Sequence, residues 1–199
     1  MEGDMHAHDP KGGDTAHGRI VLPRRRFLRT VTSMALAAPA LSLPRLSSGA
    51  YNRTSVLHFK HTHTGETLSL AYRVGDRYVP AALRVVNRFL RDFRTGEIHP
   101  IDPQLLDILH ILAKITGAYS AFQVISCYRS PATNEMLLRH YSGVARASLH
   151  LEGRAVDIRL PGVPLPDLRD AAVSLKLGGV GFYPAPNFVH VDTGRVRYW

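Results

Sequence analysis

The sequence has almost no cysteine and no long apolar run, and each shortage excludes a kind of protein. Cys127 is the single cysteine among 199 residues, so no disulfide can form within the chain and the fold must rest on its core. No stretch reaches the roughly 20 consecutive apolar residues of a membrane-spanning helix, which excludes a multi-pass membrane protein. Basic residues interleaved with aromatic ones are also missing, so we expect no nucleic-acid partner.

The composition that remains is that of a folded, basic protein. Hydrophobic residues make up 45% of the chain, enough for a packed core, and the formal net charge is +9. Residues 1–50 contribute +3 of this charge and residues 51–199 contribute +6, so the basic excess extends over both parts. Such a surface suits an acidic polymer or anionic lipid, or it is a solvated face without a specific partner.

Residues 1–50 have the features of an export leader. Residues 1–22 are polar, without an apolar period, and predict no folded structure. The segment Arg24-Arg25-Arg26-Phe27-Leu28-Arg29 resembles the twin-arginine export signal, and a short, moderately apolar stretch follows at residues 31–43. Small residues at 48–50 offer a cleavage site. We expect a leader over residues 1–50, a mature domain over 51–199 without a membrane segment, and export to the periplasm; the alternative is a basic linker before a buried helix.

Hydrophobic periodicity and capping residues predict an alternation of strands and helices in residues 51–199. One helix has clear boundaries, because Asp102 suits an N-cap, Pro103 the first turn and Gly117 the C-terminal end. The fold class that follows is α+β, with a mainly antiparallel sheet and flanking helices. The predicted strands cover 55–60, 67–73, 121–127, 154–160 and 188–193, and the predicted helices cover 80–93, 102–117, a segment from Ser130-Pro131, and 166–177 ending at Gly178.

The first candidate for chemistry is the segment that runs from His150 to Asp157. After Gly153 the chain alternates, so Asp157 lies on the strand face opposite Val156 and Ile158. An aspartate beside a core is costly unless it is paired or coordinates a metal. His150 precedes the glycine turn and can fold back toward Asp157, either as a hydrogen-bonded partner or as a second metal ligand.

A second strand, residues 188–193, also presents a histidine and an aspartate from one face. His190 and Asp192 alternate with Val189 and Val191. Together with His150 and Asp157, His190 would complete a set of two imidazoles and one carboxylate. Three protein ligands leave a fourth position for water, which is typical of catalytic zinc.

These residues carry a resemblance to a known group of enzymes. Ser148-x-His150-x-x-Gly153-x-Ala155-x-Asp157 followed by His190 resembles the LAS metallopeptidases, which include D-Ala-D-Ala peptidases and share the hedgehog-type zinc fold. A closer resemblance is to MepK-like murein endopeptidases. It rests on Ser126-x-Tyr128-Arg129-Ser130-Pro131, Gly178-Gly179-Val180-Gly181-x-Tyr183, and Phe188-Val189-His190-x-Asp192-Thr193-Gly194 ahead of Trp199.

The resemblance implies that His150, Asp157 and His190 bind Zn²⁺ and that the protein cuts cross-links between peptidoglycan stem peptides, especially those joining two diaminopimelate residues. It also implies a periplasmic enzyme of a Gram-negative bacterium. Two other functions stay open at this point. One is a D,D- or L,D-carboxypeptidase acting on the same stem peptides, and the other is a non-catalytic zinc module that binds cell wall.

The catalytic side chains are less well defined than the ligands. Relatives often have an acid three residues before the last histidine ligand, and here that position is Asn187, which cannot act as a base. Asp192 is the nearest candidate base, with the alternative that it orients a ligand. Arg129 can bind a substrate carboxylate or the developing oxyanion, the alternative being a surface ion pair.

Other polar residues give weaker signals. His58, His61 and His63 gather near a hairpin, where we expect solvated side chains rather than a second metal site. Cys127 follows an alternating strand and has no histidine at a spacing that would activate it, so we expect a small buried hydrophobic residue.

Overall fold

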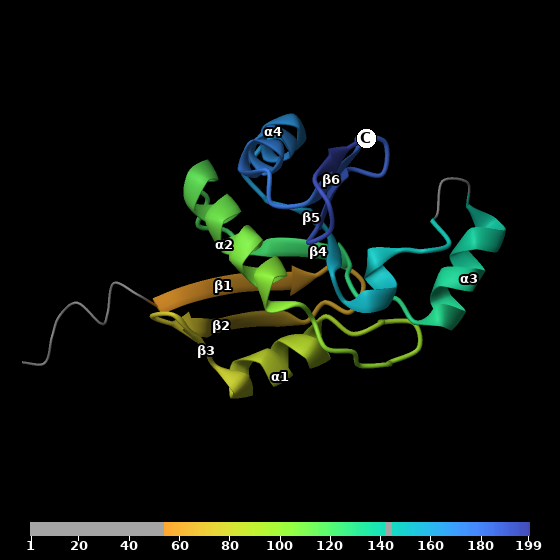
Figure 1. The fold of residues 1–199 in the computed structure, drawn as a ribbon, viewed down its shortest axis with the longest axis horizontal. Coiled ribbons are helices and arrows are strands. Elements are labelled where there is room, and N and C mark those ends of the chain that lie inside the picture. Colours follow the sequence, from red (N-terminus) through yellow and green to blue (C-terminus); the bar gives the residue numbers. More distant parts are fainter. Residues whose placement is uncertain (1–53, 142–144) are drawn as a thin grey trace, which may run out of the picture. The chain divides into compact units, whose positions relative to one another are not determined.

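The computed structural model describes residues 54–141 and 145–199, so the predicted leader lies outside the described residues. Within the described residues, eight strands form one sheet in the order β3-β2-β1-β4-β5-β7-β6-β8. The neighbouring strands from β3 to β5 can be followed in Figure 1. Five neighbouring pairs are antiparallel, and β1 with β4 and β6 with β8 are parallel. The strands are β1 Thr54–His61, β2 Thr67–Val74, β3 Arg77–Tyr78, β4 Phe122–Ser126, β5 Ala155–Arg159, β6 Gly179–Tyr183, β7 Phe188–Asp192 and β8 Arg197–Tyr198.

The predicted α+β class with a mainly antiparallel sheet is therefore confirmed. Four α-helices and a short 3₁₀-helix accompany the described strands: α1 Pro80–Phe89, α2 Pro103–Thr116, α3 Pro131–His140, η2 Leu149–Glu152 and α4 Leu165–Leu175. None of the helices in the described part of the chain combines the length and the apolar character that crossing a bilayer requires.

Two helices begin where the sequence predicts them. The Asp102 side chain accepts a hydrogen bond from Gln104 N at 2.9 Å, and Gly117 ends α2 with a φ of 64°. Ser130 Oγ accepts from Thr133 N at 3.2 Å and caps α3 in the same way. These boundaries are set by local chemistry, which is why they could be read from the sequence.

Two predicted helix ends are wrong. α1 stops at Phe89 rather than residue 93, because the buried Asp92 begins a turn in which its carboxylate accepts from Arg94 N at 2.9 Å. α4 stops at Leu175, and Lys176 takes the left-handed position with a φ of 54°. Gly178 serves another purpose, since a Cβ there would overlap the carbonyl oxygen of Asp192.

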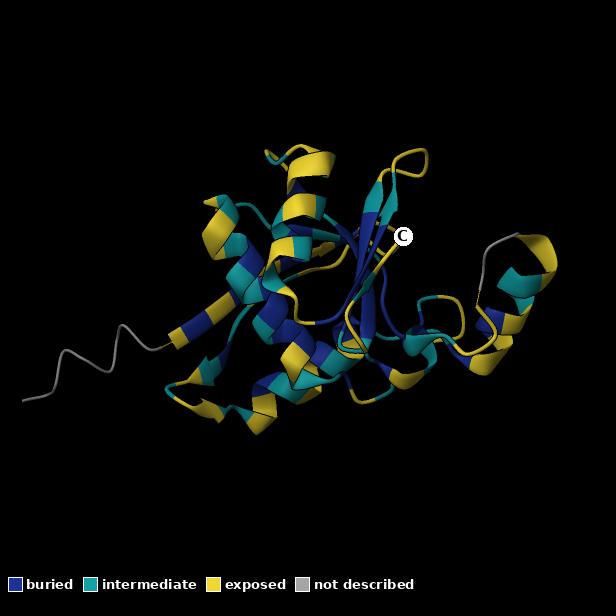
Figure 2. Cartoon of the chain, turned by 45° about the horizontal axis from the view of Figure 1, so that its top comes forward, coloured by how far each residue is buried: buried dark blue, intermediate teal, exposed yellow. Residues whose placement is uncertain are grey.

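The main core lies between the sheet and helices α1, α2 and α4, of which α2 and α4 are neighbours. α2 contacts β1, α4 contacts β6 and β7, and the buried parts of these elements form the centre of the molecule in Figure 2. Val156 and Ile158 of β5 and Val189 and Val191 of β7 belong to this core. Because side chains alternate along a strand, the intervening residues of β5 and β7 face the other side of the sheet.

Candidate metal centre

The sheet register brings two of the predicted ligands side by side. Asp157 in β5 and His190 in β7 are directly paired in an antiparallel ladder, on the face opposite the core valines. His150 comes from the short helix η2, which Ser148 caps at its start and Gly153 ends with a φ of 65°. A Cβ at Gly153 would overlap the carbonyl oxygen of Pro100, so glycine allows the chain to turn tightly from η2 into β5.

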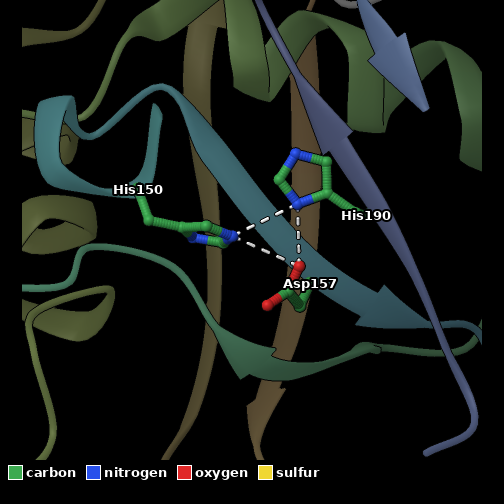
Figure 3. A group of neighbouring side chains, drawn as sticks. All are labelled: His150, Asp157 and His190. Atoms are coloured by element: carbon green, nitrogen blue, oxygen red, sulfur yellow. Dashed lines mark hydrogen bonds and ion pairs between the residues drawn. The ribbon is translucent and has the colours of Figure 1, made fainter. Parts of the chain in front are cut away.

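The three predicted ligands converge, as Figure 3 shows. His150 Nε2 lies 3.2 Å from His190 Nδ1 and 3.3 Å from Asp157 Oδ1, and His190 Nδ1 lies 2.9 Å from the same carboxylate oxygen. Nitrogen and oxygen donors bound at about 2.0–2.1 Å to a tetrahedral ion are about 3.3 Å apart. The spacing of the three atoms therefore fits a single small metal ion, and all three residues are buried.

Hydrogen bonds on the far side of each imidazole orient its lone pair toward the cluster. His150 Nδ1 lies 2.6 Å from the carbonyl oxygen of Cys127, which can only accept, so this nitrogen carries the proton. His190 Nε2 likewise faces Asp192 Oδ2 at 3.0 Å. The remaining nitrogens thus point unprotonated at each other and at a carboxylate. Three electron-pair donors that meet in a buried site require a cation or an added proton.

Without a metal, the charges within the cluster favour one added proton on His190. Burial would raise the pKa of Asp157, but the His150 and His190 imidazoles lower it well below its usual value. Burial lowers the pKa of His150. Burial would also lower the pKa of His190, but Asp157 and Asp192 outweigh it and raise that pKa. A metal ion would take the place of this proton.

Arg129 is part of the cluster rather than a member of a surface ion pair. Its Nη2 donates to Asp157 Oδ2, the carboxylate oxygen that faces away from the two imidazoles, and its Nε donates to Ser126 Oγ at 3.0 Å. The Arg129 side chain is 15% exposed and lines the cavity in front of the cluster. The arginine both fixes the carboxylate and places positive charge in the wall of the cavity.

Asp192 is fully buried behind His190, on the side away from the cavity. Its Oδ1 accepts from Gly179 N at 3.0 Å and Gly194 N at 2.8 Å, and Arg197 binds both carboxylate oxygens at 3.1 and 2.7 Å. Burial would raise the pKa of Asp192, but these hydrogen bonds, led by that with His190, keep it well below its ordinary value. Its contacts favour the orienting role among the two that the sequence left open.

Asn187 lies outside the cluster, in the turn between β6 and β7. It ends the turn between β6 and β7 with a φ of 58°, a left-handed conformation that asparagine tolerates better than most residues. It lines a second hollow next to Arg159 and Leu165, not the cavity in front of the cluster. Within the described residues, Asp157 is the only acidic side chain that lines that cavity.

The cavity itself has a volume of about 560 Å³ and is open to solvent on one side. His150, Asp157 and His190 form part of its lining. Three arginines and four aromatic side chains contribute further: Arg94, Arg129, Arg197, Tyr141, Tyr183, Phe188 and Trp199. Arg94 and Arg197 were not predicted, because no local pattern places them at one cavity with His150 and Asp157, which are distant in sequence.

The remaining sequence predictions have mixed outcomes. Cys127 is buried and free, and burial raises its pKa far above the ordinary thiol value, which confirms the expected hydrophobic role. The expectation of solvated histidines is wrong for His61, which is 1% exposed. It packs against Phe89 and Phe93, with ring centroids 6.1 and 5.4 Å away, because β1 ends beneath the turn that follows α1.

Fold and cluster together define a class of protein. It is an α+β protein whose sheet presents two imidazoles and a carboxylate at the base of an open cavity, a donor set suited to a catalytic divalent metal.

Comparison with known proteins identifies the family. A family model described as peptidoglycan L,D-endopeptidase MepK matches residues 49–199. The peptidoglycan L,D-endopeptidase MepK of Escherichia coli (strain K12) is 39% identical over 175 residues, which cover 88% of this chain and 96% of that protein. The probable peptidoglycan L,D-endopeptidase MepK of Haemophilus influenzae is 38% identical over 177 residues, covering 88% and 95%.

Among solved structures, Serratia marcescens L-Ala D-Glu endopeptidase ChiX is 21% identical with a TM-score of 0.31, and the match covers 38% of this chain and 62% of that one. The family match and the curated relatives decide the assignment: the chain belongs to the family of the peptidoglycan L,D-endopeptidase MepK. The resemblance to murein endopeptidases is confirmed.

Proposed function

We propose that this protein is a zinc-dependent endopeptidase that hydrolyses peptide cross-links of peptidoglycan outside the cytoplasm. The observation that carries the proposal is the convergence of His150 Nε2, His190 Nδ1 and Asp157 Oδ1 at the base of an open cavity. Membership of the MepK family supplies the substrate class.

The donor set supports zinc as the metal. Zn²⁺ accepts imidazole nitrogen together with carboxylate oxygen, and catalytic zinc sites use three protein ligands with one position left for water or substrate. When bound, the ion would supply Lewis-acid activation of a water molecule and of the scissile carbonyl group. His150, Asp157 and His190 would hold it, with their orientations fixed by the carbonyl of Cys127, by Arg129 and by Asp192.

Arg129 is the side chain that we assign to substrate. Its guanidinium group lines the cavity next to Asp157, where it can stabilise the negative charge that develops on the carbonyl oxygen of the scissile bond. Two of its nitrogens are already bonded to Asp157 and Ser126, so the group is held rigidly and needs little reorganisation during the reaction.

Asp192 is assigned a positioning role rather than that of the general base. Every contact that it makes supports this: it accepts from His190 and from four other donors, and it does not line the cavity. Asp192 accepts a hydrogen bond from the Nε2–H group of His190 and so favours the tautomer whose Nδ1 can bind a metal.

We also propose that residues 1–50 are a leader that exports the domain of residues 51–199 by the twin-arginine route. The support is the RRRFLR motif at residues 24–29 and the need of a peptidoglycan enzyme to reach the cell wall. Replacing Arg24 and Arg25 together by lysine should leave the full-length chain in the cytoplasm on fractionation. Normal export of that variant would contradict this route.

A muropeptide digest tests the enzymatic proposal. Purified protein should convert cross-linked muropeptides to uncross-linked ones, chelator should abolish the conversion, and added zinc should restore it. His190→Ala should be inactive and should lose bound metal. His58→Ala, which removes an exposed histidine outside the cavity, should behave as the wild type.

Two other outcomes would replace the proposal. Release of single D-alanine residues from uncross-linked peptides would identify a carboxypeptidase. Cross-links left intact by a zinc-loaded protein that binds sacculi would identify a cell-wall-binding module.

A further inference from the structure

The cavity in front of the cluster has more positive than negative charge. Its lining includes Arg94, Arg129 and Arg197, with Asp157 as the only acidic side chain among the described residues. Arg129 is paired with Asp157, and Arg197 is paired with the buried Asp192. Arg94 forms no ion pair within the described part of the chain, so its charge is available to a ligand.

Arg94 is held in place although it is exposed. Its guanidinium carbon lies 4.2 Å from the centre of the Phe93 ring. The imidazole of His63 is stacked on the same ring, nearly parallel and also at 4.2 Å. Two groups at this distance cannot share one face, so Phe93 is packed between His63 and Arg94. This stack limits the freedom of a side chain that would otherwise be mobile, and it leaves the edge of the guanidinium group, which carries the hydrogen-bond donors, free.

A buried carboxylate links the backbone of Arg94 to that of the other cavity arginine. Asp92 Oδ1 accepts from Arg94 N at 2.9 Å, and Asp92 Oδ2 accepts from both the N and the Oγ of Ser130 at 2.8 Å. Ser130 directly follows Arg129 in the chain. Asp92 is 1% exposed, so this link belongs to the interior of the fold and fixes the two arginine-bearing segments relative to one another.

Arg94 and Arg129 line the same cavity, so their positive charges repel one another. Burial lowers the pKa of Arg94, Asp92 raises it, and the positive charge of Arg129 lowers it again. Asp157 pairs with Arg129, whereas no described acidic side chain forms an ion pair with Arg94, so an anionic ligand beside Arg94 would offset this repulsion. The carboxylate of a peptide matches the planar donor pattern of such an arginine.

We propose that Arg94 binds a free carboxylate of the peptide substrate near the scissile bond, so that the enzyme prefers anionic peptides over their neutral counterparts. This inference rests on the proposed function and names the substrate chemistry that the same cavity selects. Arg94 would act in binding, whereas Arg129, which contacts a metal ligand, would act at the reacting bond.

The test compares two synthetic cross-linked peptides that differ only in one group beside the scissile bond, a free carboxylate in one and a carboxamide in the other. Wild-type protein should cleave the carboxylate peptide with a kcat/KM about tenfold or more above that of the carboxamide, mainly through KM. Arg94→Gln should remove this preference by slowing the cleavage of the carboxylate peptide only. Arg94→Lys should retain part of the preference. Arg84→Gln, an exposed arginine of α1 outside the cavity, should match the wild type.

Binding measurements separate this inference from the proposed function. Calorimetric titration of both peptides into zinc-loaded protein should show the same preference, and Arg94→Gln should abolish it. If binding shows the preference but no peptide is cleaved, the endopeptidase proposal fails and the role of Arg94 stands. If Arg94→Gln weakens the binding of both peptides equally, or of neither peptide, Arg94 does not recognise a carboxylate and the inference is overturned.

Discussion

A proton and a metal ion compete for the same nitrogen of His190. Asp157 is ionised and His150 is neutral around pH 7, because the pKa of each is lowered, whereas the pKa of His190 is raised above 6.5. Below that raised pKa, zinc binding must displace one proton. We therefore expect the affinity for zinc to rise about tenfold per pH unit and then to level off above the pKa of His190.

Calorimetry in two buffers of different ionisation enthalpy measures the protons released. Release of about one proton per zinc ion near pH 6.5 would agree with the assignment to His190. Release of two would mean that His150 is also protonated in the metal-free protein, contrary to the lowered pKa that burial gives it.

Asp192→Asn distinguishes a positioning carboxylate from a general base. The amide oxygen of asparagine can still accept from His190 Nε2, but the charge that pairs with Arg197 is lost. We expect zinc affinity to fall by about 10- to 100-fold, with kcat nearly unchanged at saturating zinc. Full zinc affinity with a kcat reduced by a factor of about 100 or more would instead identify Asp192 as the base. Asn187→Asp is the control: the residue faces another hollow, so the variant should leave both quantities unchanged.

At the scale of elements, strand β6 supports the site through its glycines. A Cβ at Gly179 would lie 2.5 Å from Asp192 Oδ2, and a Cβ at Gly181 would lie 2.7 Å from the Trp199 ring. Gly179→Ala should therefore displace Asp192 and weaken zinc binding by about tenfold or more. Gly181→Ala should retain zinc and raise KM, because it moves a ring of the cavity wall.

Metal titration and steady-state kinetics on the two variants test this division. Equal loss of zinc from both would contradict it and would indicate that β6 acts only as a scaffold whose distortion spreads through the sheet. The contrast is informative because the two substitutions add the same single methyl group, two residues apart on one strand.

The elements and the ligands could be read from the sequence to different degrees. Alternation with Val156 and Val189 placed Asp157 and His190 on one strand face, and local caps fixed the ends of α2, because each signal lies within a few residues. The early end of α1, by contrast, depends on Asp92, whose carboxylate is held by Ser130. Arg129 was expected to meet substrate, but its bond to Asp157 joins residues 28 positions apart. Such contacts form only when the chain folds, and no local sequence pattern predicts them.

At the scale of the whole molecule, the metal site couples the stability of the fold to pH. In the metal-free protein, the raised pKa of His190 means that its ion pairs with Asp157 and Asp192 stabilise the fold fully below pH 6.5. That contribution is lost as pH rises through the raised pKa. The stabilisation that zinc binding gives changes in the opposite direction with pH, because the affinity for zinc increases as the competing proton leaves.

Chelator should therefore lower the melting temperature more at pH 8 than at pH 6. Zinc at about 100 times its Kd raises the free energy of unfolding by about 2.7 kcal/mol. For a domain of this size, this raises the melting temperature by roughly 5–10 °C. His190→Ala should show no response to chelator at either pH, and His58→Ala should respond as the wild type does. Differential scanning calorimetry with and without chelator gives the comparison directly. An effect of chelator that is equal at both pH values would show that no proton leaves the cluster when metal enters, so the two imidazoles would then already be neutral in the metal-free fold.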